Sequence, residues 1–136
     1  MKRIMISIFM GFMVLTGCAG VSDVVEELPN GYVYGDEAPQ QKWIMKNPLS
    51  LNSDLYIPCK VLEYKYNQNY IIAKIEFHYD MYCVVGFEES KRLKEGKIYY
   101  YIIDTVKNIR YGEFDTYKKF NQKLKELNVN LSLSGS

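Results

Sequence analysis

The feature that most constrains the fold is a period of two over positions 71–80, with one apolar face and one mostly polar face. One face of this stretch carries Ile71, Ala73, Ile75, Phe77 and Tyr79, and the other carries Ile72, Lys74, Glu76, His78 and Asp80. A period of two is typical of a β-strand with one buried face. The run 61–66 precedes it across Asn67, Gln68 and Asn69, which favour a tight turn. Together the two stretches predict a β-hairpin.

The charges of this hairpin also predict its register. A turn centred on Gln68 and Asn69 pairs Glu63 with Lys74 on the outer face, which is a favourable cross-strand pair. The same register places Leu62, Tyr64 and Tyr66 on the core side, opposite Ile75, Ala73 and Ile71, and sets Cys59 opposite His78. A shift by one residue would bury Glu63 and Lys65, so the pattern excludes it.

A second apolar stretch, at positions 98–103, has no polar interruption. It predicts a central strand with both faces covered. Shorter strands are expected at 32–34, 42–46 and 109–111, where Gly112 ends the last one, and an edge strand at 82–85. The sequence therefore predicts an antiparallel sheet of about five to seven short strands.

The C-terminal part has helical rather than strand periodicity. Asp115 is the predicted N-cap of a helix over 116–127, and Asn128 is the predicted left-handed residue after it. The apolar stripe of this helix consists of Tyr117, Phe120, Leu124 and Leu127. An antiparallel sheet covered by one C-terminal amphipathic helix is an α+β fold with two layers.

The chain contains 13 tyrosines, which favour strands and half-buried surfaces. The cluster of Tyr99, Tyr100, Tyr101 and Tyr111 fits sheet and core packing better than a binding platform. Tyr32 and Tyr34, near the first turn, are the better candidates for exposed contacts.

The N-terminus carries a targeting signal. Lys2 and Arg3 precede an apolar run at 4–15 that is too short to span a bilayer as a permanent helix. The run ends in Leu15-Thr16-Gly17-Cys18. We therefore expect a cleaved signal peptide at 1–17, a tether at 18–28, a single domain at 29–129 and a tail at 130–136.

These four residues resemble the lipobox of bacterial lipoprotein precursors. The resemblance implies cleavage before Cys18, lipidation of its sulfur and palmitate-type acylation of the new amine. It thereby implies attachment to the cell membrane, or to the outer membrane in a cell that has two, because Ala19 rather than an acidic residue follows. Which membrane holds the protein is not decided by the sequence.

With Cys18 lipidated, Cys59 and Cys83 remain. Exported proteins occupy compartments in which disulfides persist, so this pair is a candidate disulfide. The alternative is two separate buried thiols, because bonding requires the two Cα atoms to approach within about 7 Å.

Charge excludes one class of partner. The chain has 17 basic and 16 acidic residues, and removal of Lys2 and Arg3 with the signal peptide leaves a nearly neutral domain. No basic bias indicates nucleic acid binding. No glycine-rich phosphate loop, serine-nucleophile elbow or paired-cysteine zinc pattern occurs either. We therefore expect no catalytic residue and no cofactor.

One constellation could carry chemistry. Glu76, His78 and Asp80 share a strand face, and a carboxylate–imidazole–carboxylate row can bind a divalent metal ion or relay a proton. The alternative is the solvated face of a half-exposed strand, to which Lys74 also belongs. A nucleophilic pair of Cys83 and His78 would need an oxyanion site and an orienting residue, and neither is identifiable.

The predicted helix has a basic face formed by Lys118, Lys119, Lys123 and Lys125. In a tethered protein such a face can contact anionic lipid headgroups. The alternative is an ordinary solvated helix surface.

The last quarter of the chain carries a second resemblance. The stretch 99–104, a turn, Tyr111-Gly112, then Phe114-Asp115 and a helix with Phe120 and Leu124 is similar to a pattern in small uncharacterised bacterial lipoproteins and related domains of unknown function. That pattern is structural, and the resemblance implies no activity.

The expected function is that of a lipid-anchored, non-enzymatic cell-envelope protein. It would bind another envelope protein or an incoming one, with an immunity or inhibitor role as one form of this. The alternative is a metal-binding or hydrolytic protein using Glu76, His78 and Asp80. A third hypothesis is a structural spacer at the membrane surface.

Overall fold

The computed structural model describes residues 24–46, 55–79 and 91–134. Within them, seven strands form two antiparallel sheets. The three-stranded sheet contains β1 (Val24–Glu27), β2 (Tyr32–Ala38) and β3 (Gln41–Lys46). The four-stranded sheet contains β4 (Val61–Tyr66), β5 (Tyr70–Glu76), β6 (Ile98–Asp104) and β7 (Ile109–Phe114). A short 3₁₀ turn, η1 (Pro29–Gly31), joins β1 to β2, and one helix, α3 (Tyr117–Glu126), follows β7.

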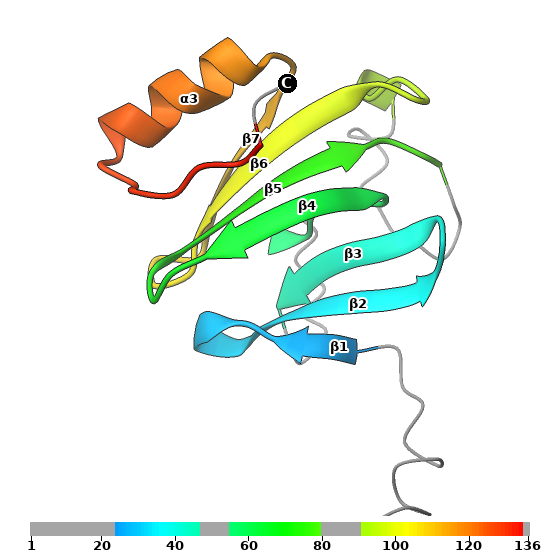
Figure 1. The fold of residues 1–136 in the computed structure, drawn as a ribbon, viewed down its shortest axis with the longest axis horizontal. Coiled ribbons are helices and arrows are strands. Elements are labelled where there is room, and N and C mark those ends of the chain that lie inside the picture. Colours follow the sequence, from blue (N-terminus) through cyan, green and yellow to red (C-terminus); the bar gives the residue numbers. More distant parts are fainter. Residues whose placement is uncertain (1–23, 47–54, 80–90, 135–136) are drawn as a thin grey trace, which may run out of the picture.

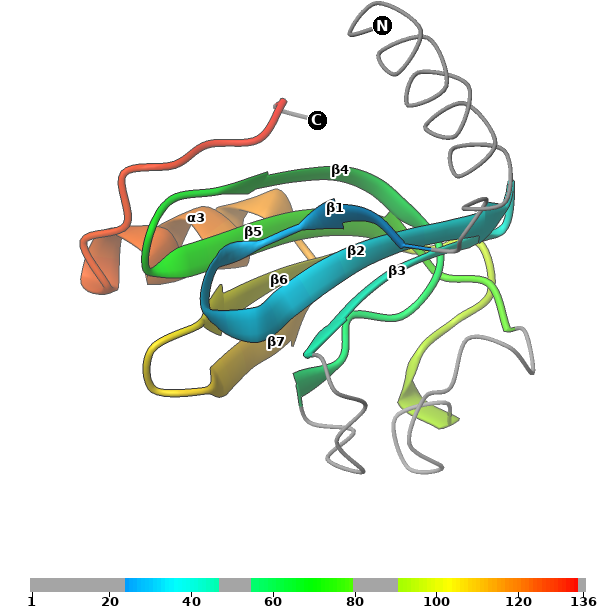
Figure 2. The same cartoon turned by 90° about the horizontal axis from the view of Figure 1, so that it is seen from below.

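The elements stack in three layers, with the four-stranded sheet in the middle. Figure 1 shows α3 on one side of this sheet and the three-stranded sheet on the other. Figure 2 shows the same order from below, with β1, β2 and β3 in front and α3 behind. The central layer is therefore buried on both faces.

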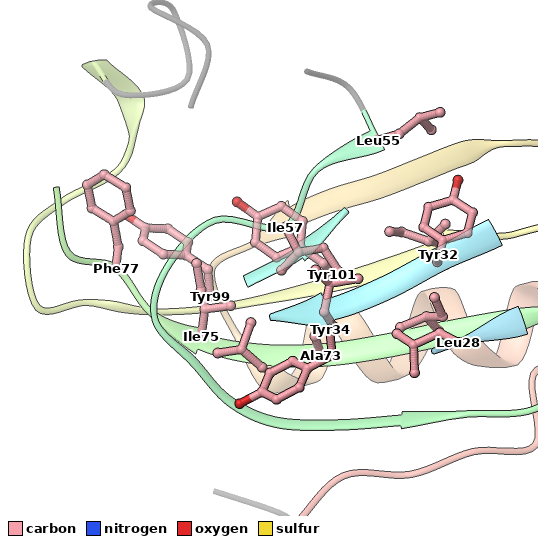
Figure 3. Close-up of a cluster of buried hydrophobic side chains, with 14 of the residues drawn as sticks. Leu28, Tyr32, Tyr34, Leu55, Ile57, Ala73, Ile75, Phe77, Tyr99 and Tyr101 are labelled. Carbon is pink, nitrogen blue, oxygen red and sulfur yellow. The ribbon is translucent and has the colours of Figure 1, made fainter. Parts of the chain in front are cut away.

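The main core lies between the two sheets, and Figure 3 shows part of it. Its members come from both sheets and from the segments that flank them: Leu28, Tyr32, Tyr34, Ile44, Leu55, Ile57, Val61, Ile71, Ala73, Ile75, Phe77, Leu93, Tyr99, Tyr101 and Ile103. A second core lies between the four-stranded sheet and α3, built on Ile72, Tyr100, Ile102, Phe120, Leu124, Val129 and Leu133. Alternate residues of β5 and β6 thus enter different cores, as the period of two requires.

Side-chain contacts close the three-stranded sheet onto β4. The hydroxyls of Tyr64 and Tyr66 both donate to the carboxylate of Glu26 on β1. The rings of Tyr34 and Tyr64 stack with their centroids 4.5 Å apart. The two hydroxyl donors lower the pKa of Glu26, and burial followed by the hydrogen bond to Glu26 raises the pKa of Tyr64. A carboxylate facing two phenol donors is favoured as the anion.

Three turns meet at one end of the molecule. Asn30 in η1 donates to the hydroxyl of Thr105 at 2.8 Å, and that hydroxyl donates to the Asn69 carbonyl at 2.8 Å. Asn108 accepts from the Tyr32 hydroxyl at 3.1 Å and from the Lys46 ammonium at 2.6 Å. These bonds tie both hairpin turns of the four-stranded sheet to the three-stranded sheet.

The coarse fold prediction is confirmed, because the described part is an α+β arrangement of seven antiparallel strands and a C-terminal helix. The prediction of one sheet is wrong. Between β3 and the segment before β4 the structure has a single backbone bridge, Ile44 to Ile57. Local alternation predicts a strand but not which strands pair with it, so the division into two sheets could not be predicted from the sequence. The predicted edge strand at 82–85 lies outside the described residues.

The predicted hairpin register is confirmed near the turn and wrong at its far end. Glu63 faces Lys74, Tyr64 faces Ala73 and Tyr66 faces Ile71. A bulge between positions 61 and 63 then brings Val61 rather than Leu62 opposite Ile75. A bulge inserts one residue and reverses the faces beyond it. Leu62 is consequently 44% exposed, whereas Val61 is buried.

Two other predicted core positions are exposed. Tyr66 is 40% exposed, because its ring reaches outward to Glu26, and Tyr79 is exposed beyond the end of β5. On the opposite face, Ile72 is fully buried under α3 rather than solvated. The alternation identified two faces correctly, but it did not reveal that a helix covers one of them.

The helix prediction is confirmed to within one residue at each end, since α3 spans Tyr117–Glu126 and Leu127 is its C-cap. Thr116, not Asp115, is the N-cap, and its hydroxyl accepts from the Lys119 N–H at 3.2 Å. The strand before it does not stop at Gly112 but continues to Phe114. Asn128 has the predicted left-handed backbone, with φ of 56°.

Both ends of the described domain extend beyond their predicted limits. Residues 24–28, predicted as part of a tether, form β1 and bury Leu28. The predicted tail packs on the four-stranded sheet, where Leu133 is buried and Ser134 donates to the Glu63 carboxylate at 3.1 Å. Isolated apolar residues in polar segments carry no periodic signal, so this packing was not predictable.

Gly35 on β2 provides a test of the outer face of the three-stranded sheet. A Cβ at this position would overlap the six-membered ring of Trp43, its cross-strand partner on β3. We expect Gly35→Ala to lower the free energy of unfolding by about 1–3 kcal/mol, because overpacking forces a buried ring to move. Urea denaturation measures the change.

The matched control is the same substitution in a Trp43→Leu background. The smaller side chain leaves room for the methyl group, so the cost of Gly35→Ala should be smaller there. An equal cost in both backgrounds would show that the ring is not the reason for glycine.

Candidate functional site

An open hollow of about 410 Å³ lies where four parts of the chain meet. They are the segment 92–97, the start of β6, the end of β7 with the residue after it, and the first turn of α3. The lining consists of Arg92, Lys94, Lys97, Tyr99, Glu113, Phe114, Asp115 and Lys119. Four of these side chains are cationic and two are acidic. We call this feature the cationic hollow.

Two of the four cations are paired within the hollow. Arg92 makes a bidentate contact with Glu113, with nitrogen–oxygen distances of 3.1 and 3.2 Å. Lys119 lies 2.9 Å from Asp115. Burial alone would raise the pKa of Glu113, but the hydrogen bond and charge of Arg92 lower it below its usual value. The hydrogen bond from Lys119 lowers the pKa of Asp115.

The other two cations, Lys94 and Lys97, form no ion pair within the described part of the chain. Lys97 instead lies over the ring of Tyr99, with its ammonium 5.6 Å from the centroid. The hollow therefore keeps an excess of two positive charges beside two aromatic side chains, Tyr99 and Phe114.

The turn that carries these lysines is fixed to the sheet. The N–H of Phe77 donates to the Lys97 carbonyl at 2.9 Å, and the N–H of Gly96 donates to the Phe77 carbonyl at 2.7 Å. The N–H of Lys94 donates to the Tyr99 hydroxyl at 2.9 Å. Leu93 is buried in the main core. The lysine stems thus project from a fixed backbone.

A histidine between two carboxylates reinforces this attachment. His78 Nε2 lies 2.6 Å from Glu76 and His78 Nδ1 lies 2.6 Å from Glu95. The other oxygen of Glu95 accepts from the Tyr79 N–H at 2.9 Å. The Glu76 hydrogen bond raises the pKa of His78 against the opposing effect of burial, and Glu95 raises it further. The Tyr79 N–H and then His78 lower the pKa of Glu95.

The structure brings together only part of the predicted row of Glu76, His78 and Asp80. Glu76 and His78 are in contact, whereas Asp80 lies outside the described residues. Glu95, 17 positions from His78, was missed because nothing in its local sequence indicates a return to this strand. Both ring nitrogens face carboxylates, and no group of three or more candidate metal ligands occurs within 24–46, 55–79 and 91–134. In this arrangement the histidine holds the 94–97 turn on the sheet.

The predicted basic face of α3 is divided. Lys118 and Lys125 are exposed. Lys119 points to the cationic hollow, and Lys123 pairs with Glu126 at 3.3 Å while lying over the Tyr111 ring. Lys94 and Lys97 were not identified from the sequence, because two lysines at a turn carry no local signal of the elements that they face.

The tyrosine predictions are partly wrong. Tyr32 and Tyr34 are buried between the sheets rather than exposed. Tyr99, Tyr100 and Tyr101 are buried in the cores, as expected. Tyr111 packs against the second core.

Cys59 is buried beside His78, whose N–H donates to the Cys59 carbonyl at 3.2 Å. The predicted register does not account for this contact, because beyond the bulge Lys60 exchanges both backbone hydrogen bonds with Glu76. Cys59 is disulfide-bonded, and its bonding partner is not among the described residues. Cys83 and the lipidation candidate Cys18 lie outside those residues, so the pairing of Cys59 with Cys83 stays a prediction.

The histidine cluster predicts a pH dependence of stability. Because contacts with Glu76 and Glu95 raise the folded-state pKa of His78 above 6.5, its contribution is complete below the unfolded pKa and is lost as pH rises through the folded pKa. We expect His78→Gln to lower the melting temperature at pH 6 by an amount equivalent to about 1 kcal/mol or less, since the pairs are partly exposed. Thermal unfolding of both proteins from pH 5 to pH 9 should show this difference shrinking above pH 6.5.

Glu95→Gln is the matched control. It removes one of the two carboxylates. In a Glu95→Gln background, the pH-dependent part of the stability difference that His78→Gln causes should therefore be smaller without disappearing. A difference that stays constant from pH 5 to pH 9 would mean that the charge of His78 does not contribute.

A family model described as protein of unknown function, DUF3997, matches residues 29–135. The chain matches no curated protein and no solved structure. Within the described residues no helix is long and apolar enough to span a membrane.

Proposed function

We propose a role in protein binding at the cell envelope for this chain, which belongs to the DUF3997 family of proteins of unknown function. In this proposal the protein is anchored by lipid on Cys18 and is extracytoplasmic. Its domain binds another envelope protein or an incoming one, and an immunity or inhibitor role is one form of such binding.

Two features of the chain support the anchor. The first is the charged and apolar N-terminus that ends in Leu15-Thr16-Gly17-Cys18. The second is the disulfide at Cys59. Disulfides persist in oxidising compartments and are rare in the cytosol, so a bonded cysteine fits an exported domain.

The observation that carries the binding proposal is the order of the three layers. The described chain begins at β1, in the outer three-stranded sheet, whereas α3 lies across the four-stranded sheet (Figure 1) and contributes its first turn to the cationic hollow. Residues 18–23 span at most about 20 Å when extended. The start of β1 therefore stays close to the membrane, and the side with α3 is the one available to a partner.

The anchor is tested by metabolic labelling with an alkyne analogue of palmitate. We expect the full chain to incorporate the label and Cys18→Ser to lose it, because the proposed anchor begins with lipidation of the Cys18 thiol and continues with acylation of its new amine. Thr16→Ser is the matched control, since it keeps a small residue in the motif and should label normally. Labelling of Cys18→Ser at the level of the native chain would exclude this anchor.

The binding role is tested by crosslinking in intact cells, followed by purification of the tagged full chain. We expect a specific protein to be recovered, and its yield should fall in Cys18→Ser, because release from the membrane lowers the local concentration. Recovery of no protein above the background of an unrelated lipoprotein would contradict the binding role and leave the anchor proposal untouched.

A further inference from the structure

We propose that the cationic hollow binds the carboxylate side chains of an acidic segment of the partner, with Lys94 and Lys97 as the contacting cations. This inference rests on the protein-binding role and names the surface and the partner chemistry for it. The charges, the backbone hydrogen bonds and the position of the hollow each support it.

The charges of the hollow are incompletely balanced. Glu113 and Asp115 form ion pairs with Arg92 and Lys119, whereas Lys94 and Lys97 form none within the described residues. Lys97 interacts with Asp115 only through its longer-range charge. Opposite charges across an interface give specificity and faster association, and like charges exclude wrong partners. Two ammonium groups without an ion pair in the described part of the chain favour carboxylates spaced along a partner segment. Tyr99 and Phe114 provide apolar surface for the methylene stems of such groups.

The backbone of the turn argues against a phosphate as the occupant. Phosphate sites in loops use several backbone N–H groups that point at the anion. Here the N–H of Lys94 donates to the Tyr99 hydroxyl, the N–H of Gly96 to Phe77, and the N–H of Lys97 to the Lys94 carbonyl at 3.1 Å. These donors are already used, so recognition depends on side-chain ammonium groups.

The position of the hollow argues against a lipid headgroup. Figure 1 shows α3 and β1 on opposite sides of the four-stranded sheet. The lining of the hollow includes the first turn of α3, and it also reaches Tyr99, which faces the three-stranded sheet. A chain tethered through residues 18–23 keeps the three-stranded sheet next to the membrane, and the α3 side of the hollow then faces away from it.

The site is also held in shape before binding. The turn is bonded to Phe77, and Glu95 attaches it to His78 and to the N–H of Tyr79. Little backbone ordering is therefore needed when a ligand arrives, which reduces the entropic cost of binding.

The test uses the full chain purified from membranes in a non-ionic detergent. The probe is a fluorescein-labelled peptide with four glutamates around one phenylalanine, followed by fluorescence anisotropy at about 0.1 M salt. We expect binding of this peptide and no binding of the same peptide with glutamine at every glutamate. The double variant Lys94→Glu/Lys97→Glu should weaken the affinity about tenfold or more, because attraction becomes repulsion at both contacts.

The matched control is Lys65→Glu/Lys107→Glu, which changes the net charge equally at exposed positions outside the hollow. It should leave the affinity within about twofold, because exposed charges beyond a Debye length of about 10 Å are largely screened. Equal weakening by both double variants would overturn the inference, since it would show a general charge effect. Absence of binding to the acidic peptide would overturn it as well.

A parallel titration with inorganic phosphate distinguishes the other anion. Protection against thermal unfolding by phosphate, lost in Lys94→Glu/Lys97→Glu, without peptide binding would assign the hollow to phosphate and overturn the inference. The two proposals fail separately. A partner recovered equally by the native chain and by Lys94→Glu/Lys97→Glu would keep the protein-binding role and reject the hollow as its site.

Discussion

The central antiparallel pair of strands, β5 and β6, is covered on both faces, and the rest of the structure depends on this. Ile71, Ala73, Tyr99 and Tyr101 face the three-stranded sheet, while Ile72, Tyr100 and Ile102 face α3. Burial of apolar surface is the main favourable term in folding, and one small sheet with a single covered face would bury little. Covering both faces lets a domain of this size build two cores around seven paired backbone positions.

The polar contacts follow from this arrangement rather than compete with it. Glu26 with Tyr64 and Tyr66 closes one long side of the sandwich, and Asn30 and Asn108 close one end. At the opposite end, Glu76, His78 and Glu95 attach the 94–97 turn. No buried side-chain nitrogen or oxygen in the described residues lacks a hydrogen-bond partner. The same contacts that satisfy these groups place Lys94 and Lys97 near the first turn of α3, where neither forms an ion pair with a described residue.

The candidate site combines elements that are distant in the sequence, and this limits what could be foreseen. The pair of Glu76 and His78 was predicted, because alternate residues of one strand share a face. Glu95 and the cationic hollow were not predicted. The 94–97 turn is placed beside the end of β5 by the packing of Leu93 and by backbone bonds to Phe77. A charged loop has the same sequence pattern whether it is solvated or packed against a sheet. Tyr32 and Tyr34 were misplaced for a related reason, because an aromatic strand can face either core or solvent.

The sequence by itself determined the strands from β2 to β7, the hairpin register near its turn, the helix and its apolar stripe, because these depend on local periodicity and on neighbouring residues. It also supplied the lipobox-like N-terminus, which underlies the proposed anchor. Only the tertiary structure decided that the strands divide into two sheets, that a bulge exposes Leu62, and that the ends of the domain pack on it. Those outcomes depend on which distant surfaces bury each other, and this is a property of the whole chain that no local pattern contains.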